Sequence, residues 1–181
     1  MGKFVSVAVR TANIDYNGRL CMVSAAAASK KILGIDRSAN PWSDIPKAKV
    51  ILVAGANIAE CAPITTDYLW QARENGAQLI VLDPRMTPIA RTADLFIPVR
   101  SGGDIGVFYG MLHVMVQRGW INRDFIAAHT TGWDAVEAIV ERYTPEYAAS
   151  IASVPASMIV RAAEMTLINN DKIEKIGRVR S

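Results

Sequence analysis

The segment from Asn13 to Met22 carries a single cysteine toward the start of a predicted helix. It is polar and rich in turn-forming residues, and the alanine-rich stretch that predicts the helix begins near Ser24. The positive end of a helix dipole and the neighbouring Arg19 both favour the thiolate of Cys21, which is the form that binds metals. The alternative is structural, because a lone cysteine is commonly a small buried apolar residue.

Polar residues also follow three short runs that predict strands, at residues 50–54, 78–82 and 95–99. Ligands of open α/β sheets bind at the carboxyl ends of the strands, so these residues are candidates for binding one nucleotide-like ligand. An aspartate at such an end suits ribose hydroxyls, and an arginine can bind phosphate through two parallel hydrogen bonds. The candidates are Gly55, Asn57 and Glu60 after the first run, Asp83 and Arg85 after the second, and Gly102 and Asp104 after the third.

The segments after the first and third runs have further features. Residues 55–60 are not the glycine-rich dinucleotide fingerprint, because one glycine stands at the tight turn and Asn57 and Glu60 offer side-chain donors and acceptors. Asp104 has a structural alternative, since an aspartate at this point is expected to be the N-cap of the following helix.

The elements that position these residues predict an α/β fold with a Rossmann-like parallel sheet and flanking helices. The runs at 50–54 and 78–82 are short, rich in β-branched and other aliphatic residues, and end in a break, as in strands buried on both faces. Apolar residues at helical spacing over 63–75, ending in Asn75-Gly76, predict the crossover helix of a βαβ unit. Pro98 restricts the third run to an edge or terminal strand. Further helices are expected over residues 104–118, 124–129, 133–142 and 155–166.

Composition narrows the function classes. The chain has 181 residues, 51% of them hydrophobic and 20% charged, which is enough for one sizeable core. Its net charge of +3 is too small and too evenly spread for a nucleic-acid partner, and only residues 172–180 are locally basic. No apolar stretch approaches the roughly 18 residues that a membrane span needs. Cys21 and Cys61 are expected to be free thiols, because no secretory signal precedes them.

Taken in order, these motifs resemble those of the molybdopterin oxidoreductases of the bis-guanine-dinucleotide class. The resemblance runs from about residue 10 to about residue 166. It implies that Cys21 binds the metal, that Asn17 approaches the pterin, and that segments 55–61, 83–85 and 102–104 hold one guanine dinucleotide arm. The implied cofactor is molybdenum, or tungsten, bis-molybdopterin guanine dinucleotide. The matching pattern is Asn13-Ile14-Asp15 with Asn17, Arg19 and Cys21; Gly55-x-Asn57-x-x-Glu60; Asp83-Pro84-Arg85 with Thr87, Ala90-Arg91 and Ala93-Asp94; and Gly102-x-Asp104.

The family includes bacterial nitrate reductases and formate dehydrogenases, and the residue after the metal ligand favours the first. Formate dehydrogenases usually place a proton-handling histidine there, whereas periplasmic and assimilatory nitrate reductases resemble this chain in having a methionine, here Met22. The resemblance therefore implies oxygen-atom transfer from nitrate, giving nitrite. Formate oxidation or another oxyanion substrate stays open. An assimilatory enzyme implies a cytoplasmic location.

Catalytic subunits of this family are several times longer than this chain. Those in question begin with a domain that holds an iron–sulfur cluster on closely spaced cysteines, and no such set occurs here. The cluster is therefore expected only in an N-terminal domain outside the chain, which is expected to be a fragment or one piece of a split enzyme. The expected divisions are 1–22, leading to the metal ligand; 23–168, the cofactor-binding α/β domain; and 169–181, a basic tail that is disordered or foreign to the family.

Two functional hypotheses follow. In the first, the chain supplies the metal ligand and one dinucleotide site, and it works only with the remaining domains or a complementary chain, an electron-transfer partner and a small oxyanion substrate. In the second, it is a nucleotide-binding fragment without turnover. Both predict that the isolated chain is catalytically inactive. Apolar surface left uncovered should also make it self-associate.

Overall fold

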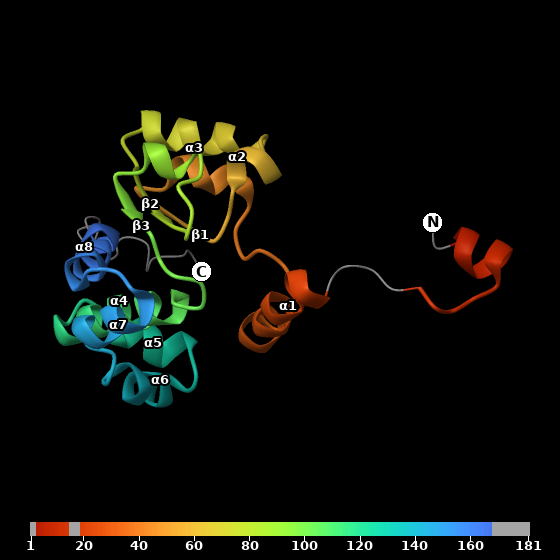
Figure 1. The fold of residues 1–181 in the computed structure, drawn as a ribbon. Coiled ribbons are helices and arrows are strands. Elements are labelled where there is room, and N and C mark those ends of the chain that lie inside the picture. The colour runs from red at the N-terminus through yellow and green to blue at the C-terminus, as the bar shows by residue number, and fades with distance from the viewer. Residues whose placement is uncertain (1–2, 15–18, 168–181) are drawn as a thin grey trace, which may run out of the picture. The chain divides into compact units, whose positions relative to one another are not determined.

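The computed structural model describes residues 3–14 and 19–167, with the side chains of residues 19–21 left aside. The chain divides into two compact units, Met1–Pro41 and Trp42–Ser181. The first contains a π-helix, Phe4–Val9, and helix α1, Arg19–Leu33 (Figure 1). Helix α1 begins at Arg19 rather than near Ser24, because arginine, leucine and methionine are better helix formers than serine. The cysteine at position 21 therefore lies in the first turn of α1.

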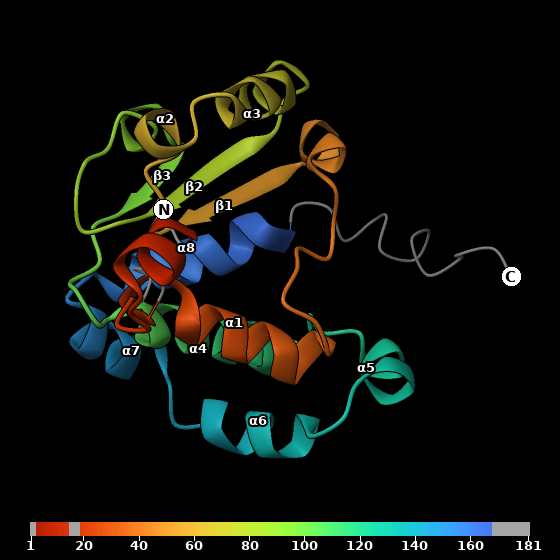
Figure 2. The ribbon, with the colours of Figure 1, turned by 90° about the vertical axis from the view of Figure 1, so that its right-hand side faces the viewer.

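The second unit contains a three-stranded parallel sheet in which β2 lies between β1 and β3 (Figure 2). The strands are β1 (Val50–Ala54), β2 (Gln78–Leu82) and β3 (Leu95–Ile97), with Ile80 of β2 paired to Leu52 and Leu95. The first two strands confirm the predicted bounds. The third ends before Pro98 and lies at an edge of the described sheet, as a residue without an N–H donor requires.

Alternate side chains of β2 enter two separate apolar cores. Leu79 and Val81 pack on the side of helix α3 (Thr65–Glu74), with Leu69, whereas Ile80 and Leu82 pack on the side of helix α4 (Asp104–Gln117). These four side chains of β2 are fully buried. Because both faces of the strand are covered from Leu79 to Leu82, its sequence is apolar at each of these positions, and the alternation expected of a one-sided sheet is absent.

Helices cover the two faces of the sheet as separate layers. Figure 2 shows α2 and α3 above it and α4, α7 and α8 below it. Among the described residues, no helix is both long and apolar enough to cross a membrane. The helices are α2 (Ile58–Cys61), α3 (Thr65–Glu74), α4 (Asp104–Gln117), α5 (Arg123–His129), α6 (Trp133–Val140), α7 (Pro145–Ala152) and α8 (Ala156–Leu167), with 3₁₀ turns at Trp42–Lys47 and Ala90–Thr92.

The helix predictions are confirmed at α3, α4, α5, α6 and α8, with ends that shift by one or two residues. Helix α7 was not predicted. It packs across α4 at a point where α4 carries Gly106 and Gly110, which leave no side chain between the two backbones. The expected fold class, a parallel α/β sheet with flanking helices, is thus present in the second unit. The domain boundaries expected after residues 22 and 168 stay predictions.

Candidate cofactor-binding site

The carboxyl ends of the three strands are joined by backbone hydrogen bonds. The N–H of Gly55, which follows β1, donates to the carbonyl of Leu82 at 2.8 Å. The N–H of Asp83, which follows β2, donates to the carbonyl of Ile97 at 3.2 Å. The residues predicted to bind a ligand after β1 and β2 therefore start from one continuous edge of the sheet, where α/β proteins bind ligands.

The loop after β1 turns at Gly55 and presents an amide side chain. Gly55 has a φ of 59°, a left-handed conformation that favours glycine. The Nδ2 group of Asn57 donates to Oε2 of Glu60 at 2.7 Å. The Oδ1 atom of Asn57 is buried without a hydrogen-bond partner, although Asn57 is the N-cap residue of α2. Its amide oxygen is therefore an acceptor that the described residues leave unused.

The loop after β2 is folded around two buried polar side chains, Asp83 and Thr87. Asp83 is 7% exposed, and its Oδ1 accepts from the N–H of Arg85 at 2.7 Å. Thr87 is 3% exposed, and its hydroxyl oxygen accepts from the N–H of Ala90 at 3.2 Å. Arg85 itself is exposed. The loop thus holds a carboxylate at the strand end and leaves a guanidinium free to reach an anion.

The segment after β3 differs from the expectation at Asp104. The N-cap of α4 is Gly103, and Asp104 is the first helical residue with no side-chain capping bond, so the predicted capping role is wrong. Helix α7 approaches the N-cap position closely, because a Cβ at Gly103 would lie 2.8 Å from the Cα of Ala152. Only glycine fits there. The carboxylate of Asp104 is half-buried in the first turn, after Gly102 with its φ of 80°.

The metal site expected at Cys21 stays a prediction. Asn17 and the side chain of Cys21 lie outside the described part of the chain. Cys61, at the end of α2, is an exposed free thiol, as expected. Within the described residues, no group of three or more histidine, cysteine, aspartate or glutamate side chains could hold a metal ion.

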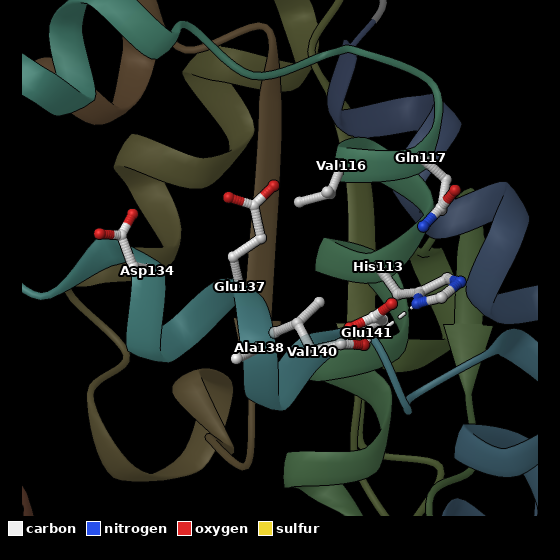
Figure 3. A pocket seen from close by; sticks show the side chains of 8 residues that line it. All are labelled: His113, Val116, Gln117, Asp134, Glu137, Ala138, Val140 and Glu141. Atoms are coloured by element: carbon white, nitrogen blue, oxygen red, sulfur yellow. Dashed lines mark hydrogen bonds between the residues drawn. The ribbon is translucent and has the colours of Figure 1, made fainter.

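A separate hollow of about 320 Å³ lies between α4 and α6 (Figure 3). His113 points toward the α6 backbone there, and its Nδ1–H donates to the carbonyl of Val140 at 3.0 Å, since a carbonyl only accepts. Glu137 accepts from Arg123 at 2.7 Å and from Trp133 Nε1 at 2.8 Å, and the Arg123 hydrogen bond lowers its pKa. The His113 hydrogen bond thus joins α4 to α6, and the Arg123–Glu137 pair joins α5 to α6.

Three comparisons with known proteins bear on this arrangement. Residues 1–171 match the molybdopterin oxidoreductase family. The chain is 44% identical over 138 residues to the assimilatory nitrate reductase catalytic subunit of Bacillus subtilis, covering 76% of the chain and 19% of that protein. It is 34% identical over 163 residues to F420-dependent formate dehydrogenase 1 subunit alpha of Methanococcus maripaludis, covering 90% and 24%.

A solved structure shares the fold. Acetylene hydratase from Pelobacter acetylenicus superposes with a TM-score of 0.62 at 26% identity, over 71% of this chain and 20% of that one. The chain thus spans about a fifth to a quarter of the length of the relatives it matches. Since the family match covers nearly every residue, the chain belongs to the molybdopterin oxidoreductase family.

Proposed function

We propose that the chain is part of the catalytic subunit of a nitrate reductase and binds one guanine dinucleotide arm of a molybdenum cofactor. The observation that carries the proposal is the shared edge of the sheet, where Gly55 and Asp83 start from hydrogen-bonded strand ends. The 44% identity to an assimilatory nitrate reductase supports the choice of substrate. An enzyme of that type would act in the cytoplasm.

The residues of the edge fit such a ligand. The unpartnered, buried Oδ1 of Asn57 requires a donor that the described residues do not supply. One oxygen of Asp83 is engaged by the N–H of Arg85, so its other oxygen is the one proposed to accept from a ribose hydroxyl. The exposed guanidinium of Arg85 is proposed to bind a diphosphate.

The remaining proposed site residues are Glu60, Gly102 and Asp104. Gly102 has a φ of 80°, and a Cβ at this position would meet no atom within 4 Å beyond its chain neighbours. A ligand can therefore approach its backbone closely. Glu60 holds the side chain of Asn57. Asp104, which is not engaged in capping, is proposed to accept a hydrogen bond from the nucleotide.

In this proposal, Cys21 binds the metal through its thiolate, and Asn17 lies near the pterin. The position of the cysteine in the first turn of α1 supports the thiolate, because the helix dipole is positive at that end. When bound, the cofactor supplies the electron pair that removes one oxygen atom from nitrate, leaving nitrite and, with two protons, water. The chain's own residues hold and orient the cofactor. The iron–sulfur cluster and the second dinucleotide arm are assigned to the rest of a parent subunit.

A formate dehydrogenase is the second candidate. The 34% identity to an F420-dependent formate dehydrogenase over 90% of the chain supports it. Met22 argues for nitrate, because a thioether carries no proton and cannot accept one from formate. A third outcome, a nucleotide-binding fragment without turnover, applies if the chain acts apart from a parent subunit.

Metal and pterin analysis of the purified chain, made in a host that produces the cofactor, tests the proposal. The native chain and a Gln78→Ala control, changed at the other end of β2 from the candidate site, are expected to contain molybdenum or tungsten and fluorescent oxidised pterin. A Cys21→Ser variant is expected to lose the metal, because serine does not supply a thiolate. Absence of both metal and pterin from the native chain would contradict cofactor binding.

The substrate is tested separately, in the complete subunit. Nitrate consumption with a reduced dye as the electron donor is the expected activity. Formate-dependent reduction of an oxidised dye, without nitrate consumption, would favour the second candidate.

A further inference from the structure

Asn57 holds an acceptor that lacks a donor at the ligand-binding edge of the sheet. Its Oδ1 is one of two buried side-chain atoms without a hydrogen-bond partner among the described residues; the other is Oε1 of Gln78. A buried carbonyl oxygen without a donor lowers stability, so native proteins seldom keep one without a reason.

The orientation of this amide is fixed by Glu60. Nδ2 of Asn57 lies 2.7 Å from Oε2 of Glu60, and a carboxylate offers only acceptors, so the NH₂ group has to face Glu60. The oxygen consequently faces the other way. The start of α2 does not use it either, because the N–H groups of Glu60 and Cys61 donate to the backbone carbonyl of Asn57, at 3.2 and 2.9 Å.

We infer that Asn57 selects a hydrogen-bond donor of the ligand, an O–H or N–H of its nucleoside part, and that Glu60 is the positioning residue that sets this preference. The inference rests on the proposed nucleotide site. An ionised phosphate has no hydrogen to give, so it would place two acceptors against each other at this atom. The edge therefore has a nucleoside-selecting part at Asn57, which follows β1, and a phosphate-binding part at Arg85, which follows β2.

Calorimetric titration of the native chain with GDP and with inorganic pyrophosphate tests the inference. The Asn57→Ala variant is expected to bind GDP about tenfold more weakly, because the donor loses its acceptor, and to bind pyrophosphate as the native chain does. An equal loss for GDP and pyrophosphate would mean that the loop is generally disturbed, and it would overturn the inference.

Altered nucleotides identify the donor. A probe that lacks the selected donor should bind the native chain and the Asn57→Ala variant equally well. Inosine diphosphate tests the 2-amino group of guanine, and 2′,3′-dideoxyguanosine diphosphate tests the ribose hydroxyls. If the variant still weakens both probes, the donor is the ring N–H of guanine, which both retain.

Glu60→Gln tests the positioning role. A glutamine amide can accept from Asn57 or donate to it, so the Asn57 side chain can adopt both orientations. If the two are equally populated, GDP affinity relative to pyrophosphate falls about twofold, in proportion to the competent fraction. In the Asn57→Ala background the same change is expected to have no effect on that ratio, because no amide is left to orient.

Gln78→Ala is the matched control, since Gln78 has the other unpartnered amide oxygen and begins β2, at the opposite end of that strand. It should bind GDP as the native chain does, and circular dichroism should show that all variants unfold cooperatively. GDP binding that Asn57→Ala leaves unchanged would overturn this inference alone. Failure of the native chain to bind GDP would overturn the nucleotide site and this inference with it.

Discussion

Asp94 joins three segments at the amino end of β2. Its Oδ2 accepts from the guanidinium of Arg73 in α3 and from the N–H of Leu79 at 2.7 Å, while its own N–H donates to the carbonyl of Leu79 at 2.9 Å. Burial acts to raise the pKa of this carboxyl, but the hydrogen bonds from Leu79 and Arg73 outweigh it, and the pKa lies below its ordinary value of 3.8. The ionised form is therefore favoured in the folded chain.

Asp94→Asn is expected to remove a pH-dependent contribution to stability. Because the folded-state pKa is below the unfolded one, the native advantage is complete above the ordinary pKa of 3.8 and is lost as the pH falls through the folded-state value. Urea unfolding of both chains from pH 6 to pH 3 should show the difference shrinking with acid. Asp67→Asn, an exposed change in α3, is the control. A difference that stays constant with pH would contradict the assignment.

At the residue scale, the sequence locates the candidate side chains but not their hydrogen bonds. The place of Gly55 and Asp83 at one edge follows from parallel pairing, because successive parallel strands end on the same side. The unused oxygen of Asn57 could not be predicted, since it depends on the side-chain conformation of Glu60. The capping role expected of Asp104 was mistaken, because α4 starts at Asp104 itself and its N-cap is Gly103.

Among the elements, the close packing of α4 against α7 depends on glycines, which have no side chain. A Cβ at Gly110 would lie 2.6 Å from the Cβ of Ala148 and 2.9 Å from Cγ2 of Ile159. Alanine and isoleucine are both fully buried here, so neither can move into solvent. A methyl group at Gly110 would therefore force the helices apart.

Gly110→Ala is expected to destabilise the chain by about 1–3 kcal/mol, the usual cost of overpacking. Helix propensity acts in the opposite direction, because alanine is favoured over glycine by about 1 kcal/mol in a helix interior. Urea denaturation measures the net effect. Adding Ala148→Gly removes the facing methyl, so the double variant should lose less than the two single changes together. A more stable Gly110→Ala chain would show that the helices are not in close contact.

The elements themselves follow from the sequence to different degrees. Strands β1 and β2 were predicted to the residue, because each is a short run dominated by aliphatic residues that ends in a break, at Gly55 and at Asp83. Helix α7 escaped prediction although its start carries a signal: Thr144 accepts from the N–H of Tyr147 at 3.3 Å, and Pro145 occupies the first turn. Two helices were predicted over residues 133–166, and the signal at Thr144 and Pro145 indicates a third helix between them.

At the scale of the whole molecule, the exposed side of α4 carries large apolar side chains. Ile105 and Phe108 lie about one turn apart and are 61% and 40% exposed. Ile105 directly follows Asp104, so an uncovered apolar patch begins beside the candidate site. The chain spans about a fifth of the length of the nitrate reductase it resembles, and we propose that such a patch contacts the remainder of a parent subunit.

Without that remainder, the purified chain is expected to associate with itself through this patch. Light scattering of the native chain over rising concentration should show a mass above the monomer. Replacing both Ile105 and Phe108 with lysine should weaken the association at least tenfold, because burying one large apolar side chain contributes about 1.5–3 kcal/mol. Ile64→Lys is the control, since Ile64 is 83% exposed but precedes α3 on the other face of the sheet. If that control dissociates the chain equally well, association is general to exposed apolar residues, and the α4 patch has no special part in it.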